Sequence, residues 1–192
     1  MFVDYLTVLM INLAAGTALL AYFVLNGITR EDNQGFASAF GIVGLIALLG
    51  GLHMTFNWPL PGSFNIAYGE STLLFGGVFL GAALALAKGW DLMPISIFAF
   101  FAGVDSLVIG LRIINLSLSK HPLLTGLGFI LVGLAGVAAA PGLNLLKKNK
   151  SFRYLAAGLL IVTALFWAYT FYSSLWAHLE SFSSWVPLTM GK

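Results

Sequence analysis

The sequence contains no cysteine and very little charge. Only 8% of its 192 residues are Asp, Glu, Lys or Arg, whereas soluble domains carry about 25%. The lack of cysteine excludes a disulfide framework and thiolate chemistry. The shortage of charge excludes a domain that stays in solution unaided. The formal net charge of +2 is too small to indicate a nucleic-acid partner.

Apolar residues dominate instead: 59% of the chain is hydrophobic and its mean hydropathy is +0.95. About 20 consecutive apolar residues cross a bilayer. We therefore expect an all-α integral membrane protein, a single domain of residues 1–192 that forms a six-transmembrane-helix bundle. The predicted spans are 2–25, 36–56, 68–88, 94–118, 122–146 and 152–179.

Two proline-containing segments qualify this prediction. Pro141 and Gly142 are expected to kink the fifth span or to end it early, because proline removes a helical hydrogen bond. The C-terminal tail, with Trp185 and Pro187, is expected to lie at the membrane interface, where tryptophan is enriched.

The distribution of Lys and Arg predicts the orientation. The connections after the first, third and fifth spans hold Arg30, Lys88, Lys147, Lys148, Lys150 and Arg153. The opposite side holds only Lys120 and Lys192. Because basic loops stay in the cytoplasm, we expect a multi-pass protein of the cytoplasmic (inner) membrane with both termini outside.

Small residues recur in the predicted spans. Gly44 and Gly51 lie in the second span, and Gly76, Gly77 and Gly81 lie in the third. Small residues let membrane helices approach closely. This pattern fits tight packing within or between subunits, and it also fits the slim walls of a pore.

Three polar residues lie deep in the fourth span. Asp105, Arg112 and Asn115 are seven and three residues apart, which places them on one helical face. Ionisable groups inside a bilayer are costly and usually have a function or a partner. They are candidates for the lining of a polar path, or for a buried charge network that locks the bundle.

A second polar group lies near the predicted outer surface. His53 and Asn57 are four residues apart at the end of the second span, Glu70 begins the third span, and His178 ends the sixth. These residues are candidates for an outer vestibule, and its histidines could respond to external pH. His53, Glu70 and His178 could alternatively hold a metal or haem, since imidazole and carboxylate suit zinc or iron.

Signatures of catalysis are missing from the sequence. It shows no nucleophile–base pair, no phosphate-binding glycine loop and no oxidoreductase motif. We therefore expect neither an enzyme nor a cofactor.

One stretch resembles a known family. The matching residues are Asn65, Leu73-Leu74-Phe75-Gly76, Leu80, Ala82-Ala83, Gly89, Asp91, Pro94, Ser96 and Phe101. They resemble the bacterial urea/amide channel family, which includes an acid-gated urea channel and amide transporters, and the close match covers about a fifth of the chain. The chain also looks like a divergent branch of prokaryotic membrane proteins of unknown function.

The resemblance implies a hexameric ring in which each protomer has its own pore, with Phe75 and Phe79 near a constriction. The sequence departs from that family in two places: residues 122–146 contain no tryptophan, and residues 156–167 contain no carboxylate. Urea as the solute is therefore in doubt. Aromatic residues of the sixth span offer either a different slot or an outer belt: Phe166, Trp167, Tyr169, Phe171 and Tyr172.

These observations lead to a first hypothesis, a passive channel or facilitator for a small polar solute, urea or short amide-like, across the bilayer. Its partners would be lipid, the solute and further copies of the chain. Two alternatives remain open. One is a membrane enzyme or redox subunit with a metal or haem at the outer face. The other is an accessory structural membrane subunit.

Overall fold

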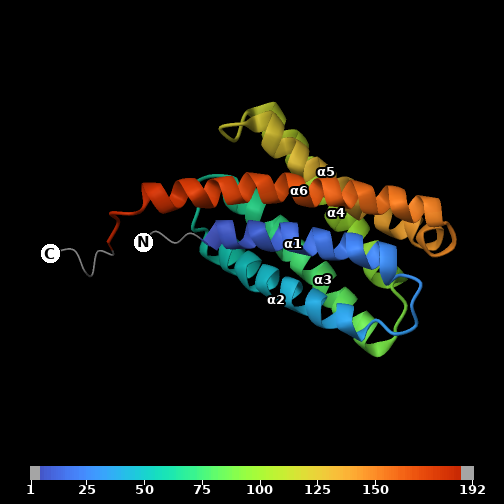
Figure 1. The fold of residues 1–192 in the computed structure, drawn as a ribbon. Coiled ribbons are helices and arrows are strands. Elements are labelled where there is room, and N and C mark those ends of the chain that lie inside the picture. The colour runs from blue at the N-terminus through green and yellow to red at the C-terminus, as the bar shows by residue number, and fades with distance from the viewer. Residues whose placement is uncertain (1–4, 187–192) are drawn as a thin grey trace.

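The fold is a bundle of long helices. The structure is a computed structural model that describes residues 5–186 (Figure 1). Its elements are α1 (Tyr5–Asn26), α2 (Gln34–Asn57), the π-helix η1 (Asn65–Glu70), α3 (Ser71–Lys88), α4 (Met93–Leu116), α5 (Pro122–Lys148) and α6 (Lys150–Ser181). Within the described part, six helical segments are long and apolar enough to cross a membrane. The predicted all-α, six-helix membrane bundle is confirmed.

The third span begins earlier than predicted, at Asn65 instead of residue 68, because η1 continues directly into α3. Asn65 is fully buried. Its side-chain oxygen accepts a bond from the Leu60 N–H at 2.9 Å, and its side-chain nitrogen donates to the Leu60 carbonyl. One amide side chain thus fixes the connection between α2 and the third span. The single turn of π-helix that follows is a feature often found at functional sites.

The helices α4 and α5 each end two residues away from the predicted position. α4 ends at Leu116, two residues early, because Ser117 has a left-handed backbone with φ of 51°. Of the two effects expected at Pro141, a kink or an early end, the early end does not occur, since α5 continues to Lys148. Pro141 is exposed while Gly142 and Leu143 are buried, so the helix packs against the bundle directly after the proline. The predicted span start at residue 2, Pro187 and Lys192 lie outside the described residues.

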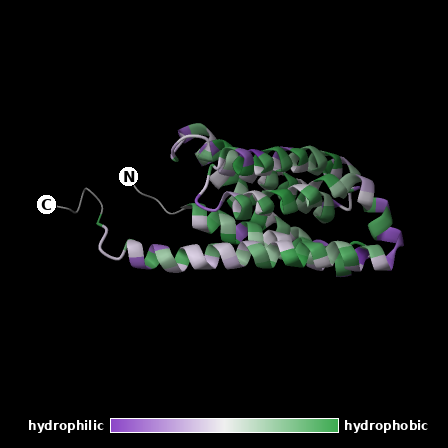
Figure 2. Cartoon of the chain, turned by 90° about the horizontal axis from the view of Figure 1, so that it is seen from above, coloured by the Kyte–Doolittle hydropathy of each residue, from purple (hydrophilic) through white to green (hydrophobic). Residues whose placement is uncertain are grey.

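The helices pack most extensively as three pairs: α1 with α6, α2 with α3, and α4 with α5. The start of α1 and the end of α6 lie at one end of the bundle, called here the terminal end (Figure 1). The α1–α2, α3–α4 and α5–α6 connections lie at the other, called here the loop end. Figure 2 shows apolar residues along the helices and polar residues concentrated near the ends, as a membrane bundle requires.

Glycines form the contact between α4 and α5. A Cβ added at Gly103 would lie 2.5 Å from the Val137 nitrogen and 2.7 Å from the Gly133 oxygen. A Cβ at Gly110 would lie 2.7 Å from the Gly126 oxygen. The two backbones therefore touch directly. We call this contact the α4–α5 seam.

A second seam joins α2 and α3 in the same way. A Cβ at Gly44 would lie 2.6 Å from the Leu80 nitrogen, and one at Gly76 would lie 2.5 Å from the Leu48 nitrogen. Gly51 likewise faces the Leu73 backbone. The small residues noted in the sequence are thus used, at these positions, for packing within one subunit.

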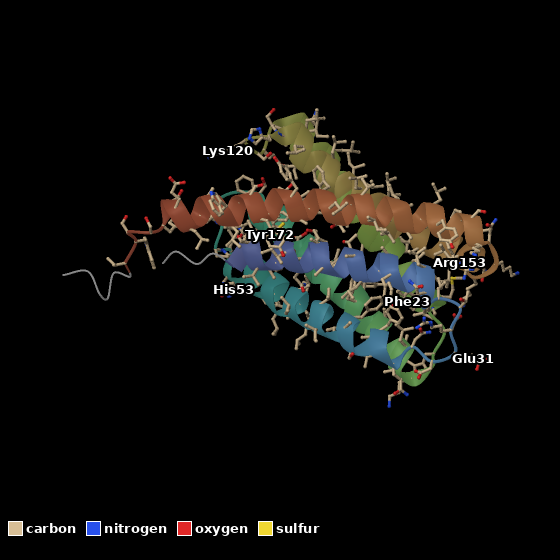
Figure 3. All side chains as sticks on the ribbon, viewed as in Figure 1. Phe23, Glu31, His53, Lys120, Arg153 and Tyr172 are labelled. Atoms are coloured by element: carbon tan, nitrogen blue, oxygen red, sulfur yellow. The ribbon has the colours of Figure 1, made fainter. Side chains whose placement is uncertain are left out.

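The loop end is tied together by polar contacts. Lys147 Nζ lies 4.0 Å from Asp91 Oδ1, and Arg153 donates to the Thr29 hydroxyl at 3.2 Å. Figure 3 shows Arg153 and Glu31 at this end, and His53 and Lys120 toward the terminal end. Most charged side chains therefore lie toward the two ends of the bundle, as expected for a membrane protein, and Asp105 and Arg112 within α4 are exceptions.

Candidate functional site

A partly open cavity of about 200 Å³ lies between the three helix pairs. Residues from all six long helices line it. On α1 its wall extends from Leu9 to Val24, which is about 22 Å at 1.5 Å per residue. The hydrocarbon core of a bilayer is about 30 Å thick. The cavity therefore follows most of the depth that a membrane would occupy.

Three aromatic rings lie together in the cavity wall. Phe75 and Phe79 both line it, and their ring centroids lie 4.4 Å apart. Phe40 packs edge-on against Phe79 at 5.1 Å. Gly16 of α1 leaves room for both α3 rings, because a Cβ there would lie 2.9 Å from Phe75 and 3.3 Å from Phe79. The two phenylalanines expected at a constriction are thus brought together in the wall.

Most hydroxyl groups of the wall are occupied by the helix backbone. Thr17 donates to the Leu13 carbonyl, Ser96 to Leu92 and Thr163 to Leu159, at 2.8, 2.8 and 2.9 Å. Such bonds to the carbonyl four residues earlier satisfy the hydroxyl inside its own helix. The wall therefore offers these oxygens as acceptors while their protons are already used.

Three polar groups of the wall lack such a bond. The indole Nε1 of Trp167 is buried and has no hydrogen-bond partner among the described residues, and the side chain is 2% exposed. Thr72 and Ser106 line the same cavity, and none of the hydrogen bonds found in residues 5–186 involves their hydroxyls. A buried polar group without a partner costs free energy. The hydroxyls of Thr72 and Ser106 are therefore available to a bound molecule, whereas the indole nitrogen of Trp167 is covered by its packing.

Asp105, Arg112 and Asn115 do not line this cavity. The wall residue next to Asp105 is Ser106, and one residue along a helix turns the side chain by about 100°. Arg112 and Asn115 are exposed, and Arg112 Nη1 donates to the Asn115 oxygen at 3.0 Å. Asp105 Oδ2 is buried without a hydrogen-bond partner in the described part, and Glu70 lies near enough to interact with it electrostatically. The expected polar path along this face of α4 therefore does not coincide with the cavity.

The four residues expected at an outer vestibule lie in separate local contacts. His53 and Asn57 are exposed and hydrogen-bonded to each other at 2.9 Å. His178 Nδ1 lies 3.3 Å from the Thr7 hydroxyl and so joins α6 to α1. Glu70 ends η1. Within residues 5–186, no three His, Asp or Glu side chains are close enough together to hold a metal, so His53, Glu70 and His178 do not form a metal site.

Some aromatic residues of α6 lie in the bundle interior, as a slot would require, and others lie on its outer surface, as a belt would require. Trp167 and Phe171 are buried and stacked with centroids 5.0 Å apart, and Trp167 lines the cavity. Tyr169 and Tyr172 are 75% and 57% exposed and face outward. Gly128 of α5 makes room for the indole, since a Cβ there would lie 2.5 Å from Trp167 Cζ2. The wall tryptophan is thus supplied by the sixth helix and faces a glycine of the fifth.

The small and hydroxyl-bearing wall residues were not singled out from the sequence. Thr17, Thr72, Ser106 and Thr163 are the clearest cases. Serine and threonine at helical spacing among apolar residues do not reveal which side of a span they occupy. Only the rotation of each helix within the bundle settles that.

The chain matches, over residues 1–181, the family described as "Protein of unknown function (DUF981)". No curated protein and no solved structure matches it. The comparisons therefore show no link to the urea/amide channel family.

Proposed function

The chain belongs to the family described as Protein of unknown function (DUF981), and we propose that it is a passive channel or facilitator for a small uncharged solute. The observation that carries the proposal is the cavity of about 200 Å³ that all six helices line. A dry apolar cavity of about 150 Å³ is already large enough to hold a molecule the size of benzene. A space this large is better explained by an occupant than by imperfect packing.

The chemistry of the wall supports an uncharged solute. No Asp, Glu, Lys, Arg or His is among the described residues that line the cavity. An ion entering an apolar wall would lose its hydration without compensation. A neutral molecule loses much less, so width and the few polar groups of the wall would decide which solutes pass.

The constriction would be set by Phe75 and Phe79. Their rings contact each other in the wall, and Phe40 packs against Phe79 from the α2 side. A solute would pass by displacing or sliding along these ring faces. The identity of the solute, whether an amide-like molecule or another of similar size, would follow from this width.

The proposed orientation follows from the basic loops. Arg30, Lys88, Lys147, Lys148 and Arg153 lie toward the loop end, and Lys120 lies toward the terminal end. We propose that the loop end faces the cytoplasm and that both termini face outward. The hexameric ring and the pH response of His53 and Glu70 stay predictions of the resemblance and of the residue types.

The accessory-subunit hypothesis and the metal hypothesis each require a structural feature that differs from the one observed. An accessory subunit needs no solute path, so its interior would be filled, whereas this bundle contains the cavity. An outer metal site requires His53, Glu70 and His178 to converge, and they do not converge in the described part of the chain. The channel is therefore the function that the geometry supports best.

Swelling of proteoliposomes under gradients of urea, acetamide, formamide and glycerol tests the proposal. We expect at least one solute to enter faster than into empty vesicles. Ala139→Phe would place a ring in the wall and should lower that rate toward the empty-vesicle value. Ala138→Phe is the matched control, because Ala138 is exposed and lies outside the wall.

Two results would count against the channel. One is the absence of protein-dependent swelling for every solute with wild-type protein that is folded and monodisperse. The other is equal loss of swelling in Ala139→Phe and Ala138→Phe, which would show that bulk on α5 acts through folding and not through the cavity.

A further inference from the structure

Two hydroxyl groups of the cavity wall are not turned back onto their own helices. Six serine or threonine residues line the cavity, and four of them donate to the carbonyl four residues earlier: Thr17, Ser71, Ser96 and Thr163. The other two, Thr72 and Ser106, form no side-chain hydrogen bond within residues 5–186. A helical hydroxyl without that backbone bond faces away from its own helix and needs a partner elsewhere.

Both hydroxyls are open to the cavity. Ser106 is only 6% exposed, so the cavity that it lines is the space left to its side chain. The sealed polar atoms without a partner in the described part of the chain belong to Asn33, Asp105 and Trp167. The oxygens of Thr72 and Ser106 are not among them and therefore keep accessible surface. A molecule in the cavity can reach both.

The two hydroxyls lie at similar depth along the bundle. α3 and α4 pack antiparallel, and a Cβ at Gly77 would lie 3.6 Å from the Phe98 ring. Five residues from this contact, toward the terminal end, are Thr72 on α3 and residue 103 on α4. Ser106 is three residues beyond, which is about 4.5 Å at 1.5 Å per residue. Two O–H···O bonds of about 2.7–2.8 Å each cover this offset, so one bridging oxygen suits the pair.

The chemistry of the pair favours a hydroxyl compound. A serine or threonine hydroxyl both donates and accepts a hydrogen bond. An alcohol does the same, so it can accept from one of the two residues and donate to the other. The remaining wall is predominantly phenylalanine, leucine, valine and alanine, which suits an apolar body. Further polar groups on the ligand would be left without partners against such a wall.

We infer that the cavity binds a small alcohol with one hydroxyl and a compact apolar body, and that this hydroxyl bridges Thr72 Oγ1 and Ser106 Oγ. This inference rests on the proposed function, because it names the chemical class of the solute that the same cavity takes. Thr72 and Ser106 are then the polar step in an otherwise apolar passage.

Cyclopentanol and cyclopentane test the hydroxyl contact, because they share a ring and differ by one hydroxyl. Their dissociation constants are measured by NMR titration of protein in detergent micelles. Ser106→Ala and Thr72→Val each remove one hydrogen bond, so each should weaken cyclopentanol binding roughly two- to tenfold. Cyclopentane should bind both variants at least as tightly as wild type. Comparing each ligand with itself across variants cancels its hydration and its partition into the micelle.

Ser174→Ala and Thr170→Val are the matched controls. Both residues lie on α6 outside the cavity wall, and their hydroxyls donate to carbonyls of the same helix at 2.9 Å. These two variants should keep the wild-type affinity for both ligands.

An intermolecular NOE locates the bound alcohol independently of its affinity. In protein labelled at the threonine methyl groups, the Thr72 resonance is identified by its loss in Thr72→Val. The carbinol proton of cyclopentanol should show an NOE to this methyl group. It should show none to the methyl group of Thr170, which lies outside the wall.

Three results would overturn the inference. One is an unchanged cyclopentanol affinity in both Ser106→Ala and Thr72→Val. Another is equal weakening for cyclopentanol and cyclopentane, which would show that these residues act through the shape of the cavity. The third is that wild-type protein binds neither ligand. Swelling measured on the same preparations decides the proposed function separately, because a protein that conducts a solute while failing these tests retains the channel and loses only this solute class.

Discussion

The two glycine seams and the cavity are built in opposite ways. In the α4–α5 and α2–α3 seams, glycine lets backbone atoms touch, and added side-chain atoms would collide at 2.5–2.7 Å. In the cavity, the walls stay apart and leave about 200 Å³ unfilled. The seams hold two rigid hairpins, and the rings of Phe75, Phe79 and Trp167 stand between them.

The difference explains how a membrane bundle can keep an open interior. Lipid tails are as apolar as the side chains, so helices associate through close packing and not through a hydrophobic driving force. The seams supply that packing within each hairpin. The space between hairpins can then remain open without loss of the fold, and substitutions in the two regions should have different consequences.

The largest effect is expected from a side chain placed in a seam. Gly103→Leu would drive Cβ against the Val137 nitrogen and the Gly133 oxygen, which belong to a helix backbone and cannot move aside. Overpacking costs about 1–3 kcal/mol or more, and because the contacted atoms are α5 backbone we expect loss of the monodisperse folded protein. Size-exclusion chromatography in detergent and thermal unfolding measure this.

Gly158→Leu is the control for that substitution. Gly158 lies on α6, and a Cβ there meets nothing within 4 Å. We expect normal chromatographic behaviour and an unchanged or higher Tm, since leucine favours a helix over glycine. Equal tolerance of leucine at Gly103 and Gly158 would contradict the close contact that defines the seam.

The second effect concerns the cavity. Phe79→Ala removes a buried ring that contacts Phe40 and Phe75 and lines the cavity. Truncating a buried phenylalanine costs about 3–5 kcal/mol, which lowers Tm by roughly 6–20 °C in a chain of this size. The same change widens the constriction, so swelling per folded protein should become faster. Thermal unfolding and swelling are measured on one preparation.

In Phe79→Ala, Tm should fall while the swelling rate rises, and this combination distinguishes a cavity residue from a seam residue. A slower or unchanged rate with folded Phe79→Ala would show that this ring does not limit passage. The comparison with Gly103→Leu is informative because that variant should lose folding and flux together.

The sequence predicted the helices well and the wall only in part. Six apolar stretches predict six helices because a bilayer demands about 20 apolar residues from each. Phe75 and Phe79 were identified through a resemblance, and the structure places both in the wall. Trp167 could be predicted only as part of an aromatic group, because four neighbouring aromatics share its helix and burial depends on the rotation of α6.

The position of a charged residue along a span does not by itself show whether the residue lines the cavity. Asp105 and Arg112 lie within a span, and that position made them candidates for a path. The face of α4 that packs inward is set by Gly103, Ser106 and Gly110, which contact α5 or line the cavity. The spacing of these glycines in the sequence marks one face of α4. Only the pairing of α4 with α5 shows that this face packs inward.

A smaller effect is expected at Asp105. Its Oδ2 is buried without a partner in the described part, and Glu70 lies within electrostatic reach. Asp105→Asn removes one of two neighbouring negative charges while keeping the shape, so Tm should rise by a few degrees, about 2–4 °C for 1 kcal/mol. Swelling should stay at the wild-type rate because Asp105 is outside the wall. A clear change in swelling with unchanged Tm would instead place Asp105 on the solute path.

The smallest effect is expected at Arg112. Its guanidinium is exposed and donates to Asn115 within the same helix, and exposed pairs contribute little to stability. Arg112→Gln keeps a hydrogen-bonding side chain and removes the charge, so Tm should change by less than about 2 °C, and swelling of neutral solutes should not change. The swelling rate and Tm of this variant are measured beside those of Ala139→Phe. The comparison shows whether a change on the outer face of α4 affects swelling less than a change in the cavity wall. Strong loss of swelling in Arg112→Gln with intact folding would mean that solute passes along the outer face of α4, between protomers, and not through the cavity that the six helices enclose.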